Sequence, residues 1–332
     1  MRTDLVWGDE VPTRDDQRNS INDLCFSPDG RKLVVAVGNR VLVYDSKDGN
    51  LLHSLRGHKD TVYTVDWSGD GKRFASGGAD RTVIIWNSKA EGMLKYTHND
   101  SVQRVTHDPS TGVLASCTGL DFGLWSQEEK SVNKHKVHAK ILSAAWALAG
   151  RLLALGFVDG KISIRDRDGA EKVSMSRTAP VWCLAWSTAP DELDLLVVGC
   201  WDQTLSFYKS TGAQQNKDRK LDYNPCTLGY CHGGDYIVIG GSDRKTTLLT
   251  REGVKIGVVC AKNGWVWSAK GRPGHDSVAV GCDDGSIELY RLRFTNVHSL
   301  YRDRYAFRDR MTDVIVQHLV SEQKVRGHVH QA

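Results

Sequence analysis

Three side chains in this sequence of 332 residues have the chemistry of a hydrolase triad. His58, Ser76 and Asp80 follow one another in a short stretch, and a serine activated by histidine and aspartate can attack a carbonyl carbon. Such a serine usually needs a nucleophile elbow of the form Gly-x-Ser-x-Gly, and nothing around Ser76 supplies one. No other cluster of titratable residues suggests a catalytic pocket. The sequence therefore predicts a protein that is not an enzyme.

One group of residues could bind a metal, namely Cys226, Cys231 and His232. Zinc sites usually carry paired Cys-x-x-Cys motifs, which this group lacks. Paired glycines such as Gly77 and Gly78 stand in turn contexts, without the helix that follows a phosphate-binding loop. We therefore expect no metal and no other cofactor.

Composition and charge indicate an ordinary globular protein. Hydrophobic residues make up 40% of the chain, and 44 basic against 40 acidic residues leave a net charge of +4. This balance does not indicate a nucleic-acid partner, which would need clustered Lys and Arg. Residues 301–310 interleave arginine with aromatic residues and could stack on RNA bases. Because Asp303 and Asp309 halve their charge, we expect a connector that packs under the main domain and no RNA site.

The sequence suggests an intracellular protein. No stretch approaches the roughly 18 apolar residues of a membrane span, and the start of the chain lacks the apolar run of a signal peptide. The eight cysteines are scattered, mostly in apolar runs, which indicates reduced thiols. We expect a soluble chain without disulfides and without direct membrane insertion.

A period of about 40 residues runs through most of the chain. A short β-branched run returns about seven times and ends at a bulky or polar pair, at Tyr44-Asp45, Trp86-Asn87, Trp125-Ser126, Arg165-Asp166, Tyr208-Lys209, Leu249-Thr250 and Tyr290-Arg291. All but the first are preceded by an aspartate in a glycine-bearing turn, namely Asp80, Asp121, Asp159, Asp202, Asp243 and Asp284. Asp121 is closer to its strand end than the others, which predicts a shortened hairpin in the third unit.

Each unit alternates short apolar segments with turn residues, as in residues 21–26, 32–37 and 40–44. These segments are predicted strands, and four strands per unit at this period are typical of a β-propeller blade. A blade buries its faces only against neighbouring blades, so the ring must close. Residues 3–7 are strand-like and precede the first blade. We expect them to pair with the last blade beside residues 287–290.

The predicted fold is all-β, a seven-bladed β-propeller over residues 1–294 in which residues 1–8 supply the closing strand. Residues 295–332 are expected to form a C-terminal connector tail and the start of a truncated second propeller. Within them, residues 313–319 should form a strand with an unpaired apolar edge.

The second unit carries His58, Ser76, Asp80 and Trp86 at positions that resemble the WD40 family of propellers. The resemblance implies that the four side chains form a buried hydrogen-bond chain, which ties an outer loop of the blade to its inner strands. Such a chain is favourable only when it is fully paired. The other units retain the aspartate, but most of them lack the His or the Trp.

In WD40 propellers the binding surface usually lies where the loops before the innermost strands converge. The candidates for this protein-binding face are Tyr63, Arg104, Trp182, Trp201 and Trp267. Exposed aromatic and arginine side chains are the most common hot spots of interfaces. For Trp182 and Trp267, burial in the core is an equally good interpretation.

Several stretches carry a closer resemblance, namely GHKDTVY (57–63), KRFASG (72–77), LKYTHND (94–100), WVW (265–267), YRDRY (301–305) and MTDVIVQHL (311–319). Over almost the whole chain they are similar to the N-terminal propeller of the intraflagellar transport protein one-twenty-two family. The resemblance implies a scaffold subunit of intraflagellar transport complex A, in retrograde transport, cilium assembly and the ciliary entry of membrane proteins. It implies other complex A subunits, and ciliary membrane cargo or adaptors, as partners in the cytoplasm, cilium and basal body. Residues 327–332 depart from the family's continuation, as expected for a fragment or an incomplete gene model.

Other interaction modules share this fold and remain open, such as a vesicle-coat subunit or a ubiquitin-ligase substrate receptor. The segment that follows the propeller in the full gene discriminates between them, because a helical solenoid there favours transport. Fold alone does not decide between these functions.

Overall fold

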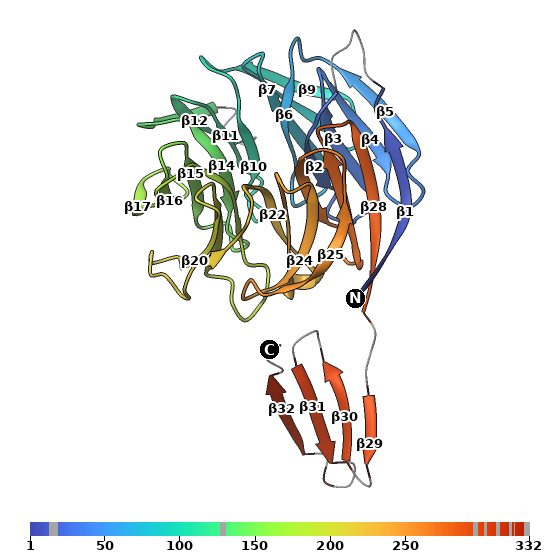
Figure 1. Ribbon diagram of the computed structural model, residues 1–332. Coiled ribbons are helices and arrows are strands. Elements are labelled where there is room, and N and C mark those ends of the chain that lie inside the picture. The colour runs from blue at the N-terminus through green and yellow to red at the C-terminus, as the bar shows by residue number, and fades with distance from the viewer. Residues whose placement is uncertain are drawn as a thin grey trace.

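Strands make up nearly all of the regular structure. The computed structural model describes residues 1–12, 19–126, 131–294, 298–301, 304–309, 313–318, 321 and 323–328. These residues form eight four-stranded sheets and one 3₁₀ turn, His232–Gly234. Seven sheets pack around one another as the blades of a propeller, and the eighth is formed by strands within residues 298–328 (Figure 1). In the described part of the chain no helix is long and apolar enough to cross a membrane. The predicted all-β, seven-bladed propeller is confirmed.

Each blade runs from an innermost strand outward. Blades one to three are β2 (Ile21–Phe26), β3 (Lys32–Val37), β4 (Arg40–Asp45) and β5 (Leu51–Arg56); β6 (Val62–Trp67), β7 (Arg73–Gly78), β8 (Thr82–Asn87) and β9 (Gly92–Thr97); β10 (Arg104–His107), β11 (Leu114–Cys117), β12 (Asp121–Ser126) and β13 (Ser131–Lys136). Blades four and five are β14 (Ile141–Trp146), β15 (Leu153–Phe157), β16 (Lys161–Arg165) and β17 (Glu171–Ser176); β18 (Val181–Trp186), β19 (Leu195–Cys200), β20 (Thr204–Lys209) and β21 (Arg219–Lys220). Blade six is β22 (Pro225–Cys231), β23 (Tyr236–Gly241), β24 (Lys245–Thr250) and β25 (Lys255–Ala261), and blade seven begins with β26 (Val266–Gly271), β27 (Ser277–Cys282) and β28 (Ser286–Arg293).

The N-terminal strand closes the ring. Strand β1 (Arg2–Glu10) pairs antiparallel with β28 and becomes the fourth strand of blade seven, as Figure 1 shows. Leu5 lies opposite Tyr290, and Asp9 lies opposite Ile287. The predicted pairing with residues 287–290 is therefore confirmed. Because the first strand of the chain completes the last blade, the two ends of the ring are held together by a ladder of backbone hydrogen bonds.

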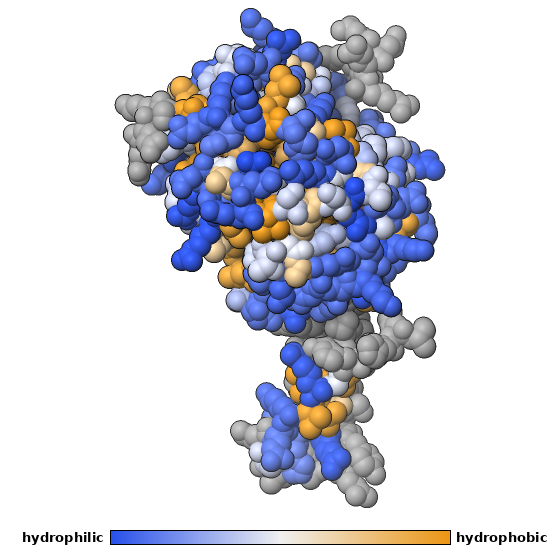
Figure 2. Space-filling view, turned by 90° about the vertical axis from the view of Figure 1, so that its left-hand side faces the viewer, coloured by the Kyte–Doolittle hydropathy of each residue, from blue (hydrophilic) through white to orange (hydrophobic). Residues whose placement is uncertain are grey.

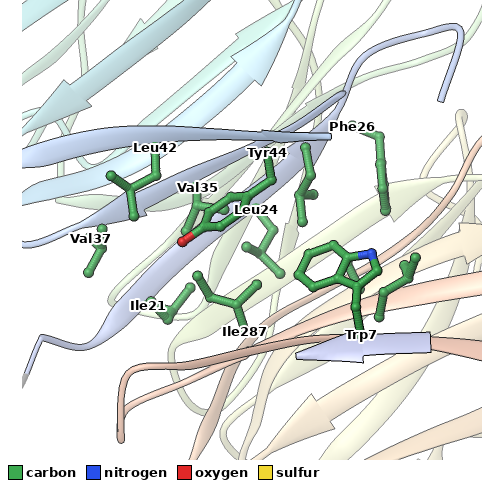
Figure 3. Packing of buried hydrophobic residues seen from close by; sticks show 12 residues of the cluster. Trp7, Ile21, Leu24, Phe26, Val35, Val37, Leu42, Tyr44 and Ile287 are labelled. Carbon is green, nitrogen blue, oxygen red and sulfur yellow. The ribbon is translucent and has the colours of Figure 1, made fainter. Parts of the chain in front are cut away.

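The hydrophobic core lies between neighbouring blades. In β2, β6, β14 and β18 the first, third, fourth and sixth residues are buried, which shows that inner strands are covered on both faces. Figure 3 shows the cluster between blades seven and one, where Trp7 and Ile287 pack against Ile21, Leu24 and Tyr44. The closing strand β1 thus contributes Trp7 to the core, in addition to its backbone hydrogen bonds with β28.

A belt of polar side chains links the innermost strands. Val65 N–H donates to Asp23 Oδ2 (3.2 Å), and Val105 N–H donates to Thr64 Oγ1 (3.2 Å). Equivalent bonds run from Leu24 N–H to Ser268 Oγ (3.1 Å) and from Ala269 N–H to Thr227 Oγ1 (3.2 Å). Each acceptor is the third residue of its innermost strand. Because each bond joins adjacent blades, the belt fixes their register around the axis.

The eighth sheet contains β29 (His298–Tyr301), β30 (Arg304–Asp309), β31 (Asp313–His318) and β32 (Lys324–His328). Strand β31 pairs with β30 on one side and with β32 on the other. The expectation of an unpaired edge on this strand was wrong, because residues 324–328 form a further strand beside it. Of the arginine-rich segment, Arg302, Asp303 and Arg310 lie outside the described residues, and its remainder ends β29 and forms β30. The predictions for residues 311–319 and 327–332 also include residues outside the described part of the chain, namely 311, 312, 319 and 329–332.

Candidate protein-binding face

Four polar residues of blade two form one hydrogen-bonded chain. His58 Nε2 lies 2.8 Å from Ser76 Oγ, and His58 Nδ1 lies 3.0 Å from Asp80 Oδ1. The indole N–H of Trp86 donates to Ser76 Oγ at 2.9 Å. The chain joins the loop before β6 to β7, to the following turn and to β8. All four residues that the WD40 resemblance named therefore lie together.

This geometry is that of a structural hydrogen-bond network. His58 Nδ1–H donates a hydrogen bond to the carboxylate of Asp80, which leaves Nε2 to accept a hydrogen bond from the Ser76 hydroxyl. The Ser76 oxygen in turn accepts from Trp86. Ser76 is fully buried (0% exposed), so a substrate carbonyl has no approach to its oxygen. The arrangement leaves no exposed nucleophile at this position.

Burial and hydrogen bonding set the protonation states in this chain. Burial lowers the pKa of His58, against the opposing effect of Asp80, so the ring is neutral at pH 7. Burial alone would raise the pKa of Asp80. Hydrogen bonds from Thr82, the Lys59 N–H and His58 outweigh it and lower that pKa to about 2. A neutral imidazole and an ionised carboxylate are the states that the geometry requires.

Blade three contains a second network of the same kind, which the sequence reasoning missed. His98 Nε2 lies 2.9 Å from Ser116 Oγ, and His98 Nδ1 lies 3.2 Å from Asp121 Oδ1. Eighteen residues separate the His from the Ser in both blades. Searching for this separation alone, without requiring the full set, would have found the second network.

The hairpin after β11 is shorter than its counterpart in blade two. Cys117 pairs with Phe122, which leaves residues 118–121 between them, whereas Gly77 pairs with Val83 around residues 78–82. The loop is one residue shorter, as predicted from the position of Asp121. Asp121 is consequently the first residue of β12, yet it still reaches His98.

The turn aspartates of blades four and five have partners from the preceding loop. Asp159 Oδ2 lies 2.9 Å from His138 Nε2, in a pair that is close to half exposed. Asp202 Oδ2 lies 3.0 Å from Nη2 of Arg177, which replaces the histidine. In blades two to five a histidine or arginine therefore bonds to each turn aspartate.

Blades six and seven differ. Asp243 Oδ1 accepts the backbone N–H of Lys245 (3.2 Å), and Asp284 Oδ1 accepts the N–H of Ser286 (3.0 Å) and its hydroxyl (2.6 Å). Neither carboxylate forms an ion pair with a described residue. Burial raises the pKa of Asp243.

Three of the five candidates for the binding face come together. The rings of Trp182 and Trp201 stack with their centroids 4.2 Å apart, and Trp267 lies 5.9 Å from Trp182. Trp265, which the sequence reasoning did not select, adds a fourth ring 5.5 Å from Trp267. All four residues are half-buried, which lies between the two interpretations considered for Trp182 and Trp267. We call these four residues the tryptophan cluster.

The other two candidates stand apart. Arg104 donates to Asp23 Oδ2 at 2.8 Å and thereby links blade three to blade one. Tyr63 is half-buried on β6 and has no ring contact with the cluster among the described residues. Below the cluster the channel narrows to a cavity of about 50 Å³, and its lining includes Asp23, Arg104, Trp182, Trp267 and Lys270.

The candidate metal residues do not converge. Cys226 and Cys231 are buried on β22, where burial raises the pKa of each thiol to about 12. The Nδ1 atom of His232 lies 2.5 Å from Asp276. Among the described residues no three His, Cys, Asp or Glu side chains form a group that could hold a metal ion.

The exposed large hydrophobic side chains of the described residues are distributed over several blades. On the side of the molecule shown in Figure 2, hydrophilic residues predominate over the propeller. Exposed hydrophobic side chains such as Leu51, Met93 and Val254 lie on the outer strands or turns of different blades. The tryptophan cluster, in contrast, brings four half-buried aromatic side chains together.

Comparison with known families matches this architecture. Residues 20–291 match the model described as "IFT122 first beta-propeller". The chain belongs to this family. Residues 298–332 match the model of the IFT122 second beta-propeller, which begins where the eighth sheet begins.

Relatives of the IFT122 first-propeller family span nearly the whole chain. The "Intraflagellar transport protein 122 homolog" of Xenopus tropicalis is 52% identical over 98% of the chain, and that of Danio rerio is 53% identical over 98%. The chain spans 28% of the length of each of them. The more distant "WD repeat-containing protein 1" of Gallus gallus is 24% identical over 86% of this chain and 49% of its own length.

Proposed function

We propose that this chain is a non-catalytic scaffold unit of intraflagellar transport complex A. The observation that carries the proposal is the 52–53% identity with two intraflagellar transport protein 122 homologues over 98% of the chain. The buried Ser76 supports a non-catalytic role, because the only serine–histidine–aspartate set expected from the sequence has no access to a substrate. Rigid blades with many short loops suit a subunit that binds several others.

The proposed domain organisation follows the two family matches. Residues 1–294 form the first propeller, which residues 1–8 help to close, and residues 295–332 form a connector and the start of a second propeller. The match of residues 298–332 to a second-propeller model supports this division.

The proposed binding face comprises Tyr63, Arg104, Trp182, Trp201 and Trp267. The partners are other complex A subunits, with ciliary membrane cargo or adaptors as further candidates. The protein then serves retrograde transport, cilium assembly and the ciliary entry of membrane proteins, in the cytoplasm, cilium and basal body. Half-buried, clustered indoles support this face, since tryptophan is among the residues most enriched at interface hot spots.

Affinity purification tests the proposal. The chain is expressed with a tag in a ciliated cell line, and co-purifying proteins are quantified by mass spectrometry. We expect intraflagellar transport complex A subunits in the wild-type sample. The Trp182→Glu variant should recover fewer of them, whereas Leu51→Glu, at an exposed position on the outermost strand β5 of blade one, should not differ from wild type. Recovery of vesicle-coat or ubiquitin-ligase components in their place would contradict the ciliary assignment and leave the propeller intact.

A further inference from the structure

The tryptophan cluster is built from matching positions on either side of blade six. Trp182 and Trp267 are each the second residue of an innermost strand, β18 in blade five and β26 in blade seven. Trp201 and Asp283 each follow the last residue of the second strand, in the same two blades. The aromatic rings thus lie on both sides of the innermost strand of blade six. In blade seven, the carboxylate of Asp283 stands at the position that the indole of Trp201 has in blade five.

The cluster reaches blade six directly. The indole N–H of Trp201 donates to the carbonyl oxygen of Pro225 at 3.1 Å. Pro225 pairs with Gly241, two residues before Asp243. Ser242, the residue before Asp243, exchanges hydrogen bonds with Asn224, the residue before Pro225: Asn224 N–H donates to Ser242 Oγ at 3.0 Å, and Ser242 N–H donates to the Asn224 carbonyl at 3.1 Å. The Asp243 carboxylate therefore belongs to the surroundings of the cluster.

A second carboxylate, that of Asp283, borders the cluster, and one of its two oxygens has no partner among the described residues. Asp283 Oδ1 is buried and forms no hydrogen bond with any described residue. The position lies against Gly264, where a Cβ atom would collide with this oxygen, next to Trp265. A buried carboxylate oxygen without a donor is costly, so a donor from outside the chain would stabilise this site.

Blades six and seven are also the blades whose turn aspartates lack a cationic partner. In blades two to five a histidine or arginine from the preceding loop lies next to the turn aspartate. Arg244 and Lys245 follow Asp243 in sequence, but neither forms an ion pair with it. Lys245 and Lys255 act electrostatically on Asp243, but among the described residues neither Asp243 nor Asp283 forms an ion pair.

We propose that the tryptophan cluster, with Asp243 and Asp283, binds an extended protein segment that carries arginine or lysine side chains. This inference rests on the proposed function and specifies the chemistry of the partner. A cation gains energy over the face of a tryptophan ring, and a guanidinium or ammonium group supplies the donors that the two carboxylates lack. The carboxylates disfavour a nucleic acid, although its bases could stack on the same rings.

The segment lies across the face and does not enter the channel. The cavity below the cluster holds about 50 Å³, which is room for one or two water molecules and not for an arginine side chain. Deeper in the channel, Arg104 is paired with Asp23, and burial lowers the pKa of Lys270.

Selection from a random decapeptide library displayed on phage tests the proposal with the 332-residue chain as bait. We expect the recovered peptides to be enriched in arginine and lysine. Dissociation constants are then measured by fluorescence anisotropy for one such peptide and for the same peptide with citrulline in place of arginine. Citrulline is a neutral isostere, so its affinity should be about tenfold weaker.

Variants locate the site. The double variant Asp243→Asn with Asp283→Asn should weaken the arginine peptide about tenfold. Asp159→Asn alters the equivalent turn of blade four and should bind like wild type. Circular dichroism checks that each variant is folded, and the citrulline comparison needs no change in the protein at all.

Three results would overturn the inference: no enriched peptide, enrichment of apolar or acidic peptides, or equal binding of the arginine and citrulline peptides. Tighter binding of a uridine oligonucleotide than of the basic peptide would assign the surface to RNA. Co-purification of complex A subunits does not depend on these peptides, so the proposed function stands or fails by its own experiment.

Discussion

The Ser76 hydroxyl takes part in two buried hydrogen bonds. It lies 2.8 Å from His58 Nε2 and accepts from the Trp86 indole at 2.9 Å. The sequence identified this network because blade two retains the full set of side chains. It did not reveal that blade three has an equivalent, because Asp121 is shifted by a shorter hairpin.

Replacing Ser76 with alanine should lower the free energy of unfolding by about 2 kcal/mol. The hydroxyl is fully buried, so its loss leaves the Trp86 N–H and His58 Nε2 without a partner. Urea unfolding followed by circular dichroism measures the change. Ser54→Ala, at an exposed position on β5, is the control. A loss no larger than that of the control would show that the network contributes little to stability.

The pH dependence of stability should report on His58. Its pKa in the folded protein lies below the ordinary value of 6.5, chiefly through burial, so the unfolded chain binds a proton more readily. Stability is therefore fully present above about pH 6.5 and is lost as the pH falls below it. Asp80, with a folded pKa of about 2, adds a loss below its ordinary value of 3.8.

We expect the urea midpoint to fall between about pH 7.5 and pH 5.5, and to fall less in His58→Gln than in wild type. His53→Gln changes an exposed histidine on β5 and should leave the wild-type dependence intact. An unchanged dependence in His58→Gln would mean that other groups cause the acid sensitivity.

At the scale of strands, turn chemistry and period made the blades predictable, since each hairpin is a local feature of the sequence. The closing strand was also predictable, because residues 3–7 have a strand pattern and the ring needs a fourth strand for its last blade. The polar belt was not, because Asp23, Thr64 and Ser268 differ in type and share only their position in the innermost strands.

Trp7→Ala should lower the free energy of unfolding by about 3 kcal/mol. The Trp7 side chain is 8% exposed, stacks on Tyr44 and donates its N–H to the carbonyl of Ser46. Leu5→Ala is a matched control on the same strand, because Leu5 is 56% exposed. Guanidinium unfolding compares the two. Equal losses would show that β1 stabilises the ring through its ladder alone.

At the scale of the whole molecule, ring closure assembles surfaces that sequence patterns cannot group. Trp182 and Trp267 were each candidates on their own, but blades five and seven bring them within 5.9 Å across blade six. Trp265 was part of the WVW stretch that resembles the family, but only its distance of 5.5 Å from Trp267 assigns it to the same surface. Arg104 was expected on the binding face. Its hydrogen bond to Asp23 also gives it a structural role, because it links blade three to blade one.

The most direct measurement of the central claim is rescue of cilia. A hybrid gene, in which this chain replaces the matching 28% of the Danio rerio relative, is introduced into zebrafish that lack that relative, and cilium length is measured. We predict that the hybrid and its Leu51→Glu variant, changed on the outermost strand of blade one, restore cilia and that an equally abundant Trp201→Glu variant does not. Failure of the well-expressed hybrid, or full rescue by Trp201→Glu, would contradict an intraflagellar transport scaffold that works through its tryptophan cluster.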